Sequence, residues 1–196
     1  RWAIVGLLFT ASLINYFDRA TISFALPLIS TELHLGPESK GLLLSAFFWS
    51  YTLMQIPIGV LLSRFGPRRV QSVLLIIAVG GATMFGNADG FAELLVGRAM
   101  IGLGVAGSLM DGLKAIVIWF PRERIALVNG CMIMLGSLGA ITATAPTDWL
   151  LAWVGWRGLF ETLTFVTVTI AGLIYFSVPE SDPDAEAATT SQMSLT

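Results

Sequence analysis

Six long apolar segments, separated by short turns, make up most of this chain and limit the folds that it can adopt. They cover residues 2–33, 41–62, 69–85, 91–120, 125–153 and 159–178, with ends uncertain by several residues. A helix needs about 20 apolar residues to cross the hydrocarbon core of a bilayer. The third segment reaches this length when it is extended to Asn87. The pattern predicts an all-α membrane protein with six transmembrane helices.

The composition agrees with a chain whose solvent is lipid. Hydrophobic residues make up 55% of the sequence and charged residues 12%, against roughly 25% charged in an average soluble domain. Cys131 and His34 are the only residues of their types, so we expect no metal site and no disulfide within the chain. Ser108 lacks the sequence setting of a serine hydrolase, and no glycine-rich phosphate loop is present. We therefore expect no enzyme, no cofactor and no nucleic-acid partner.

The charges in the turns predict how the helices are oriented. One set of turns carries the arginines Arg64, Arg68, Arg69, Arg122 and Arg124. The other set carries His34, Glu38, Lys40, Asp89 and Glu93. Because short basic turns stay in the cytoplasm, we expect both ends of this segment to be cytoplasmic, in a bacterial inner membrane. Residues 1–180 form the predicted bundle, and the acidic, Ser/Thr-rich residues 181–196 form a predicted disordered cytoplasmic segment.

Two ionisable residues lie deep in the first apolar segment. At about 1.5 Å of rise per residue, Asp18 is roughly 24 Å from Trp2, and Arg19 is next to it. Ionisable groups at that depth are costly and mark a functional site by default. A mutually neutralising structural pair is the alternative. In the fourth segment Asp111 precedes Lys114 by three residues, which places both on one helical face.

The basic turn over residues 59–69 resembles the loop signature of the major facilitator superfamily. The frame is formed by Gly59, Arg64, Gly66 and Arg68, while Ser63 stands where the family has an aspartate. The resemblance implies that this aspartate braces a cytoplasmic gate, and serine brings no charge to it.

A second superfamily motif is recognisable in the fourth segment. Arg98, followed by Gly102 and Gly104, resembles the superfamily's fourth-span arginine motif. An interfacial arginine that extends toward the membrane surface is the alternative.

Further motifs resemble the anion:cation symporter branch of this superfamily, over most of residues 1–180. They are Asn15-Tyr16-x-Asp18-Arg19, Ala46-Phe47-x-Trp49-x-Tyr51, Gln55-x-Pro57-x-Gly59, Trp119-Phe120-Pro121 and Gly155-Trp156-Arg157. The resemblance implies that Arg19 binds a carboxylate and that Asp18 takes part in proton coupling. The branch's acidic residue in the fourth span falls on Val105 here, so Asp111 either replaces it or only neutralises Lys114.

Several other polar and small residues carry expectations of their own. We expect Tyr51, Gln55 and Asn129 to line the substrate cavity with Arg19, and a hydrogen bond between helices is the alternative for each of the three. We expect an ion pair between Arg157 and Glu161, one turn apart. We also expect close helix packing at the glycines of the fifth segment, Gly130, Gly136 and Gly139.

The sequence thus predicts one six-helix half of a secondary active transporter that takes up a small organic anion with protons. Its expected partners are the anionic substrate, protons, the lipid bilayer and a second six-helix half. That half belongs to the same longer chain or, alternatively, to a dimer partner. An antiporter of organic phosphates or other anions, and a non-transporting membrane scaffold or sensor, are the competing functions.

Overall fold

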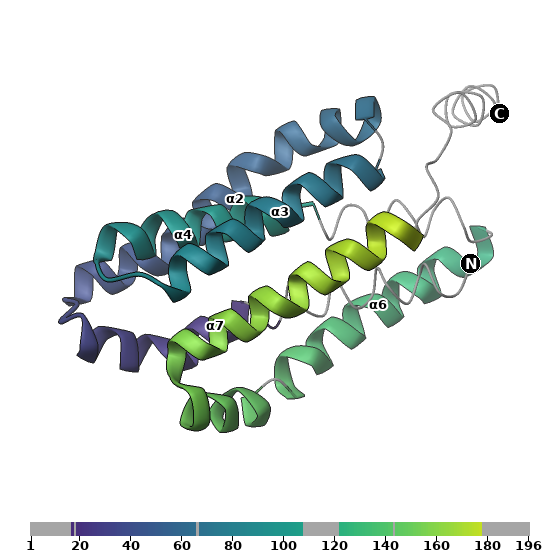
Figure 1. The fold of residues 1–196 in the computed structure, drawn as a ribbon. Helices are drawn as coiled ribbons and strands as arrows, with labels where there is room; N and C mark the ends of the chain where they lie inside the picture. Colours follow the sequence, from purple (N-terminus) through teal and green to yellow (C-terminus); the bar gives the residue numbers. More distant parts are fainter. Residues whose placement is uncertain (1–16, 18, 66, 108–121, 143, 178–196) are drawn as a thin grey trace.

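The computed structural model describes residues 17, 19–65, 67–107, 122–142 and 144–177, and within these ranges the regular structure is α-helical. The first described helix covers residues 19–32. It is followed by α2 (Pro37–Phe65), α3 (Pro67–Gly86), α4 (Phe91–Val105), α6 (Arg122–Thr142) and α7 (Thr144–Ser177). Each of the six predicted spans overlaps one of these helices, which confirms the predicted fold class (Figure 1). The predicted segment 181–196 lies outside the described residues.

Local sequence signals explain where the helices begin and end. α2 and α3 each start with a proline, Pro37 and Pro67, whose fixed φ suits the first helical position and whose missing N–H is not needed there. The first helix ends where His34 adopts a left-handed φ of 51°. The N–H of Leu35 then donates to the carbonyl of Ser30 at 3.0 Å, which is the bond that closes a Schellman-type helix end.

A glycine divides the last helix into two parts. Gly155 has φ 69° and ψ −179°, so residues 144–154 and 156–177 are separate helical segments joined by a sharp bend.

The predicted fifth span, residues 125–153, was too long, since α6 ends at Thr142 and α7 begins at Thr144. The apolar run continues through Trp149 and Trp153, and hydropathy alone does not reveal that the chain turns within it.

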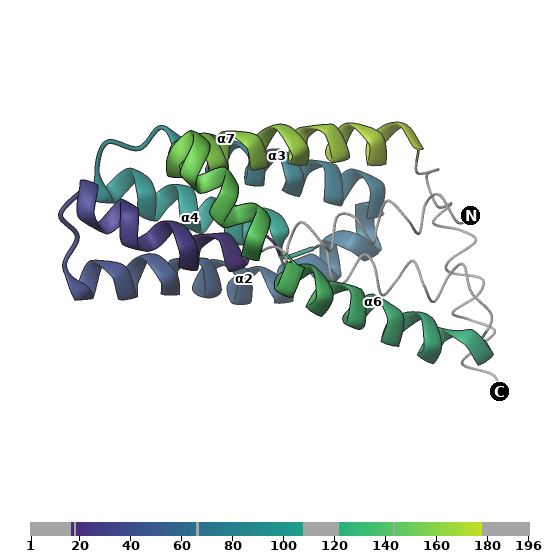
Figure 2. The ribbon, with the colours of Figure 1, turned by 90° about the horizontal axis from the view of Figure 1, so that it is seen from below.

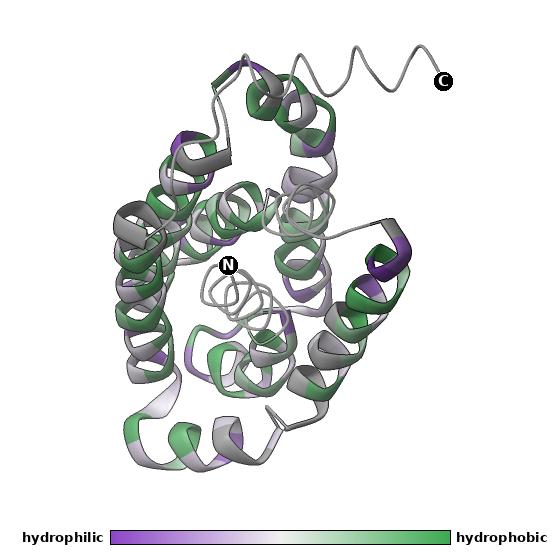
Figure 3. Ribbon diagram, turned by 90° about the vertical axis from the view of Figure 1, so that its right-hand side faces the viewer, coloured by the Kyte–Doolittle hydropathy of each residue, from purple (hydrophilic) through white to green (hydrophobic). Residues whose placement is uncertain are grey.

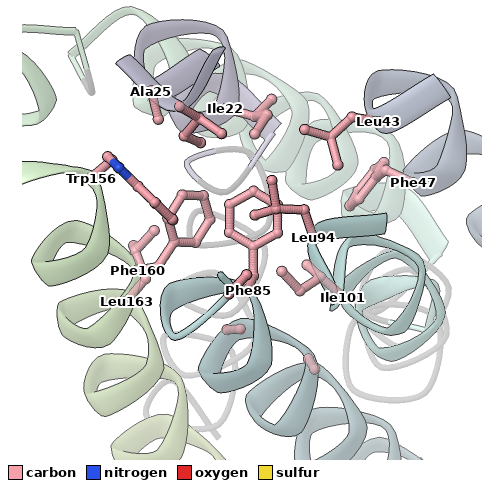
Figure 4. Close-up of a cluster of buried hydrophobic side chains, with 14 of the residues drawn as sticks. Ile22, Ala25, Leu43, Phe47, Phe85, Leu94, Ile101, Trp156, Phe160 and Leu163 are labelled. Carbon is pink, nitrogen blue, oxygen red and sulfur yellow. The ribbon is translucent and has the colours of Figure 1, made fainter. Parts of the chain in front are cut away.

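The helices are arranged around α3 and α4. α3 packs against α4 and α7, and α2 packs against α4, whereas α6 makes few contacts with α7. Figures 1 and 2 show α6 at the edge of the bundle in both views. The buried core comprises Ile22, Ala25, Ile29, Leu43, Phe47, Ala78, Ala82, Phe85, Ala88, Leu94, Ile101, Val105, Trp156, Phe160 and Leu163 (Figure 4). Phe85 lies at its centre, with its ring centroid 4.4 Å from that of Phe160.

Glycines bring α3 and α4 into direct backbone contact. A Cβ on Gly81 would lie 2.7 Å from the carbonyl oxygen of Gly97, and one on Gly97 would lie 2.8 Å from that of Gly81. Such close approach is how helices associate where lipid removes the hydrophobic driving force. Within the described part of the chain the prediction for Gly130 was wrong, since no described atom lies within 4 Å of its Cβ position. Gly136 is buried, and the structure does not describe the surroundings of Gly139.

The outer surface of the bundle is apolar. Exposed side chains on α2 recur at helical spacing at Leu42, Trp49, Leu53, Ile56 and Val60. Figure 3 shows hydrophobic residues on most of the described helices, with fewer hydrophilic residues among them. Of the described helices, the stretches Pro37–Leu62 and Arg69–Gly86 are long and apolar enough to cross a membrane. A bundle that is apolar outside as well as inside matches a lipid environment.

One end of the bundle is joined by a polar cluster. Glu32 accepts a hydrogen bond from Trp156 Nε1 at 2.6 Å and forms an ion pair with Arg157. Arg157 Nη2 also donates to the carbonyl oxygen of Ala88 at 3.0 Å and lies 3.8 Å from Asp89. The cluster thereby connects the end of the first helix, the α3–α4 turn and the bend in α7. The predicted pair of Arg157 with Glu161 was wrong, because Gly155 and Trp156 turn the guanidinium toward Glu32.

This cluster gives a direct test of the two pairings. We expect Glu32→Gln to lower the thermal unfolding midpoint of the detergent-solubilised protein by a few degrees, because both bonds weaken when the carboxylate loses its charge. Glu161→Gln is the matched control, since Glu161 is exposed and has no ion pair among the described residues. Equal effects of the two substitutions would contradict the observed pairing.

Candidate substrate site

Arg19, the predicted anion-binding residue, lies against two aromatic rings of α2. It is half-buried at the start of the described part of the first helix. Its Cζ lies 4.5 Å from the ring centroid of Tyr51 and 5.4 Å from that of Phe47. Both distances are within the range of a cation–π interaction. The structure thus brings together two of the predicted substrate-binding residues, Arg19 and Tyr51.

The two rings form a stacked pair. Phe47 and Tyr51 are one helical turn apart, with ring centroids 6.1 Å apart and an interplanar angle of 14°. Phe47 is fully buried, whereas Tyr51 is half-buried. Sequence reasoning assigned no site role to Phe47. Its spacing of four residues from Tyr51 was the available signal, because such residues lie on one face of a helix.

Gln55 and Asn129 occupy different surroundings. Gln55 Nε2 donates to the carbonyl oxygen of Ala106 at 3.3 Å, so it forms the interhelical bond that was one of its two predicted roles. Asn129 lies on α6, and its Oδ1 is buried without a hydrogen-bond partner among the residues that the structure describes. Among the described residues, no hydrogen bond or ring contact joins Asn129 to Arg19, Tyr51 or Gln55.

Arg98 is buried beside the same aromatic pair. It is 2% exposed, and its Cζ lies 4.6 Å from the ring centroid of Phe47. The alternative of an arginine extending to the membrane surface was therefore wrong. Val105, at the branch's acidic position, is also buried, at 3% exposure.

The remaining predicted residues are placed only in part. Asp18, Asp111 and Gly66 lie outside the described residues. Ser63 is in α2 and Arg68 is in α3, but their side chains are not described. Arg64 is exposed at the end of α2, with Cζ 5.5 Å from the ring of Phe65. No atom lies within 4 Å of the Cβ position of Gly59.

The geometry around Arg19 suits an anion. The Nε of Arg19 is buried and has no hydrogen-bond acceptor in the described part of the chain. A buried cationic donor without an acceptor is unfavourable, and a ring face attracts the cation without neutralising it. A carboxylate that reached this group would complete its hydrogen bonding. The described residues contain no group of three His, Cys, Asp or Glu side chains able to hold a metal ion.

An all-α bundle with an apolar exterior and a cationic, aromatic site between its helices has the features of a membrane transport protein. The chain belongs to the Major Facilitator Superfamily, whose family model matches residues 8–194. This family consists of transporters, which confirms the expectation that the protein is not an enzyme.

Relatives of the chain include proteins named as transporters of organic acids. The chain is 31% identical over 192 residues to the "Probable sulfoacetate transporter SauU" of Cupriavidus necator, covering 98% of this chain and 44% of the relative. It is 29% identical to the "Probable galactarate/D-glucarate transporter GarP" of Escherichia coli, covering 88% and 40%. The "Uncharacterized transporter YybO" of Bacillus subtilis is 33% identical, with 92% and 42% covered. The chain therefore spans less than half the length of these relatives.

Solved structures show the same fold. A bacterial homologue of the human lysosomal transporter Spinster matches with a TM-score of 0.80 at 23% identity, over 93% of this chain and 44% of that one. A D-xylose–proton symporter matches with a TM-score of 0.77 at 17% identity, over 99% and 53%. At these identities the likeness supports the fold alone.

Proposed function

We propose that this chain is the anion-binding half of a secondary active transporter that takes up a small organic anion together with protons. The observation that carries the proposal is the placement of Arg19, whose guanidinium lies over Tyr51 and Phe47 and whose buried Nε lacks an acceptor in the described chain. A guanidinium recognises a carboxylate through two parallel N–H···O bonds.

The relatives support an organic acid as the substrate. They are named as probable transporters of sulfoacetate and of galactarate and D-glucarate, and all of these compounds carry carboxylate groups. We infer a small carboxylate of this kind, and D-glucarate is the probe that we choose for the experiments. An antiporter of organic phosphates or other anions would use the same arginine but would need no proton site.

Proton coupling is assigned to the acidic residues of the first and fourth spans. Asp18 precedes the anion-binding arginine in sequence, and Asp111 lies six residues beyond Val105, the branch's acidic position. A buried carboxyl group can be shifted to titrate near neutral pH by its surroundings. Asp18 is the primary candidate, and Asp111 either assists it or neutralises Lys114.

We infer that the bundle works with a second six-helix half in a bacterial inner membrane, with both ends of this segment cytoplasmic. The chain spans 40–44% of the relatives named above, and transporters of this kind place the substrate between two halves. The second half is part of the same longer chain or, alternatively, a dimer partner. The gate on the cytoplasmic side would use the basic turn from Gly59 to Arg68.

Uptake by the full-length protein in proteoliposomes tests this function. We expect an inward proton gradient to drive accumulation of radiolabelled D-glucarate and Asp18→Asn to abolish gradient-driven uptake, because the carboxyl group can no longer exchange a proton. Counterflow exchange should survive in that variant. Gradient-driven uptake that persists in Asp18→Asn would remove this residue from proton coupling.

The same measurement separates the competing functions. Uptake that needs an anion inside the vesicle and ignores the proton gradient would indicate an antiporter. No uptake and no exchange, in protein that remains folded, across D-glucarate, sulfoacetate and inorganic phosphate would favour a scaffold or sensor.

A further inference from the structure

Phe47 contacts the predicted anion-binding residue Arg19, but its own side chain is buried and is not exposed in the candidate site. The ring is fully buried at the edge of the core, beside Leu43 (Figure 4). Two guanidinium groups lie over this one ring, that of Arg19 at 5.4 Å and that of Arg98 at 4.6 Å. No other described aromatic ring has two arginines over it.

The contacts differ between the two rings of the pair. Tyr51 contacts Arg19 but not Arg98, and it keeps part of its surface exposed. Phe47 contacts both arginines and is closed off from solvent. A ligand bound at Arg19 can therefore touch Tyr51, whereas it cannot touch Phe47.

We propose that Phe47 is a positioning residue, which holds the guanidinium of Arg19 against Tyr51 and links it to Arg98. This inference rests on the proposed function, because it assigns the group that prepares Arg19 for the anion. The physical reason is that a ring face attracts a cation without offering an acceptor that would satisfy its N–H groups. Two like charges near each other repel, and a ring that attracts both offsets part of that repulsion.

Positioning by a ring affects affinity more than turnover. An arginine that is already oriented loses less side-chain entropy when the anion binds. Without the ring, Arg19 would sample other rotamers and would have to be ordered by the ligand itself. The expected result is a weaker interaction with the anion and an unchanged capacity for transport once the site is filled.

Arginine side-chain NMR tests the inference without any substrate. In nanodiscs with ¹⁵N-labelled arginine, the ring currents of Phe47 and Tyr51 shift the Nε–H signal of Arg19. That signal is assigned from its loss in Arg19→Lys, and the Arg98 signal from its loss in Arg98→Lys. We expect Phe47→Leu to move both signals and Tyr51→Leu to move that of Arg19 chiefly. Phe48→Leu is the matched control, because Phe48 is 57% exposed and none of the described arginines lies over its ring.

Transport supplies the second readout. With D-glucarate as the probe, Phe47→Leu should raise KM about tenfold, the size of one desolvated cation–π contact, and leave kcat within about twofold of the wild type. Phe47→Tyr keeps a ring face and should restore most of the affinity. It also replaces Phe47→Leu in the NMR comparison if the leucine variant does not fold, and it should then leave both arginine signals near their wild-type positions.

The two proposals fail in different ways. An Arg19 signal that does not move in Phe47→Leu, while the protein stays folded, would overturn the positioning role whatever is transported. A wild-type protein that takes up no D-glucarate would count against the proposed function, and the NMR result would still decide the role of Phe47. A loss of kcat with unchanged KM would also contradict positioning.

Discussion

Arg19→Lys is expected to weaken the binding of D-glucarate about 100-fold, which is a larger loss of affinity than the one expected for Phe47→Leu. Lysine keeps the charge but loses the planar pair of donors that match a carboxylate. Hydrogen bonds to charged groups are worth about 1.5–3 kcal/mol each, so losing one gives an effect of this order. The measurement is the concentration dependence of uptake, or of counterflow exchange, in proteoliposomes.

Two features of the site should make the loss larger than at a surface arginine. A lysine ammonium is compact and strongly hydrated, whereas the position over Tyr51 and Phe47 is partly buried. The planar guanidinium can also stack on a ring and still present its edge to a ligand. To bind the same carboxylate, a lysine ammonium over these rings would have to turn its N–H donors away from the rings and toward the ligand.

Arg124→Lys is the matched control for this experiment. Arg124 is exposed near the start of α6, outside both the candidate site and the basic turn assigned to the gate. We expect this substitution to leave the affinity for D-glucarate within about twofold, because exposed charges contribute little. Unchanged affinity in Arg19→Lys, or equal losses in both variants, would place the anion elsewhere.

Local and periodic features of this fold could be predicted from the sequence. Long apolar runs gave the helices, because burial of backbone polar groups in lipid leaves few alternatives to a helix. Pro37 and Pro67 suit the first position of a helix, but a proline alone does not locate a helix start, since Pro57 lies inside α2. The bend at Gly155 falls in the turn predicted between the fifth and sixth spans. The end of α6 at Thr142 could not be predicted, since the apolar run continues through Trp149 and Trp153.

The site could be predicted only as separate residues. Arg19 and Tyr51 were both identified, because a buried charge and a polar aromatic residue stand out in apolar segments. Their contact depends on how the first helix packs against α2. This packing involves residues far apart in the chain, so the pattern around either residue does not reveal it. Phe47 was missed for a related reason: a phenylalanine in an apolar run has no feature that separates packing against lipid from packing against a cation.

The packing glycines show the same limit. Gly130 and Gly81 both lie in apolar helices, and nothing local distinguishes them. Only the structure shows that Gly81 faces the backbone of α4, whereas Gly130 has no described atom within 4 Å of its Cβ position. This difference leads to the largest expected effect on stability.

Gly81→Ala is expected to destabilise the protein by roughly 1–3 kcal/mol, the usual cost of overpacking. The added Cβ would lie 2.7 Å from the carbonyl oxygen of Gly97 and 2.8 Å from the backbone nitrogen of Ile101. Because these are backbone atoms, no side chain can rotate away, and α3 and α4 must move apart. The free energy of unfolding in mixed micelles of mild detergent and SDS measures this loss.

Gly130→Ala is the control, and it should be neutral or slightly stabilising, because alanine has the higher helix propensity and open space surrounds the new methyl group. Gly97→Ala should resemble Gly81→Ala, since its Cβ would lie 2.8 Å from the carbonyl oxygen of Gly81. The double substitution should then cost less than the sum of the two, because helices already separated by the first methyl group accommodate the second. Strict additivity, or a loss of stability in Gly130→Ala as large as that in Gly81→Ala, would show that the contact between α3 and α4 does not limit the stability of the bundle.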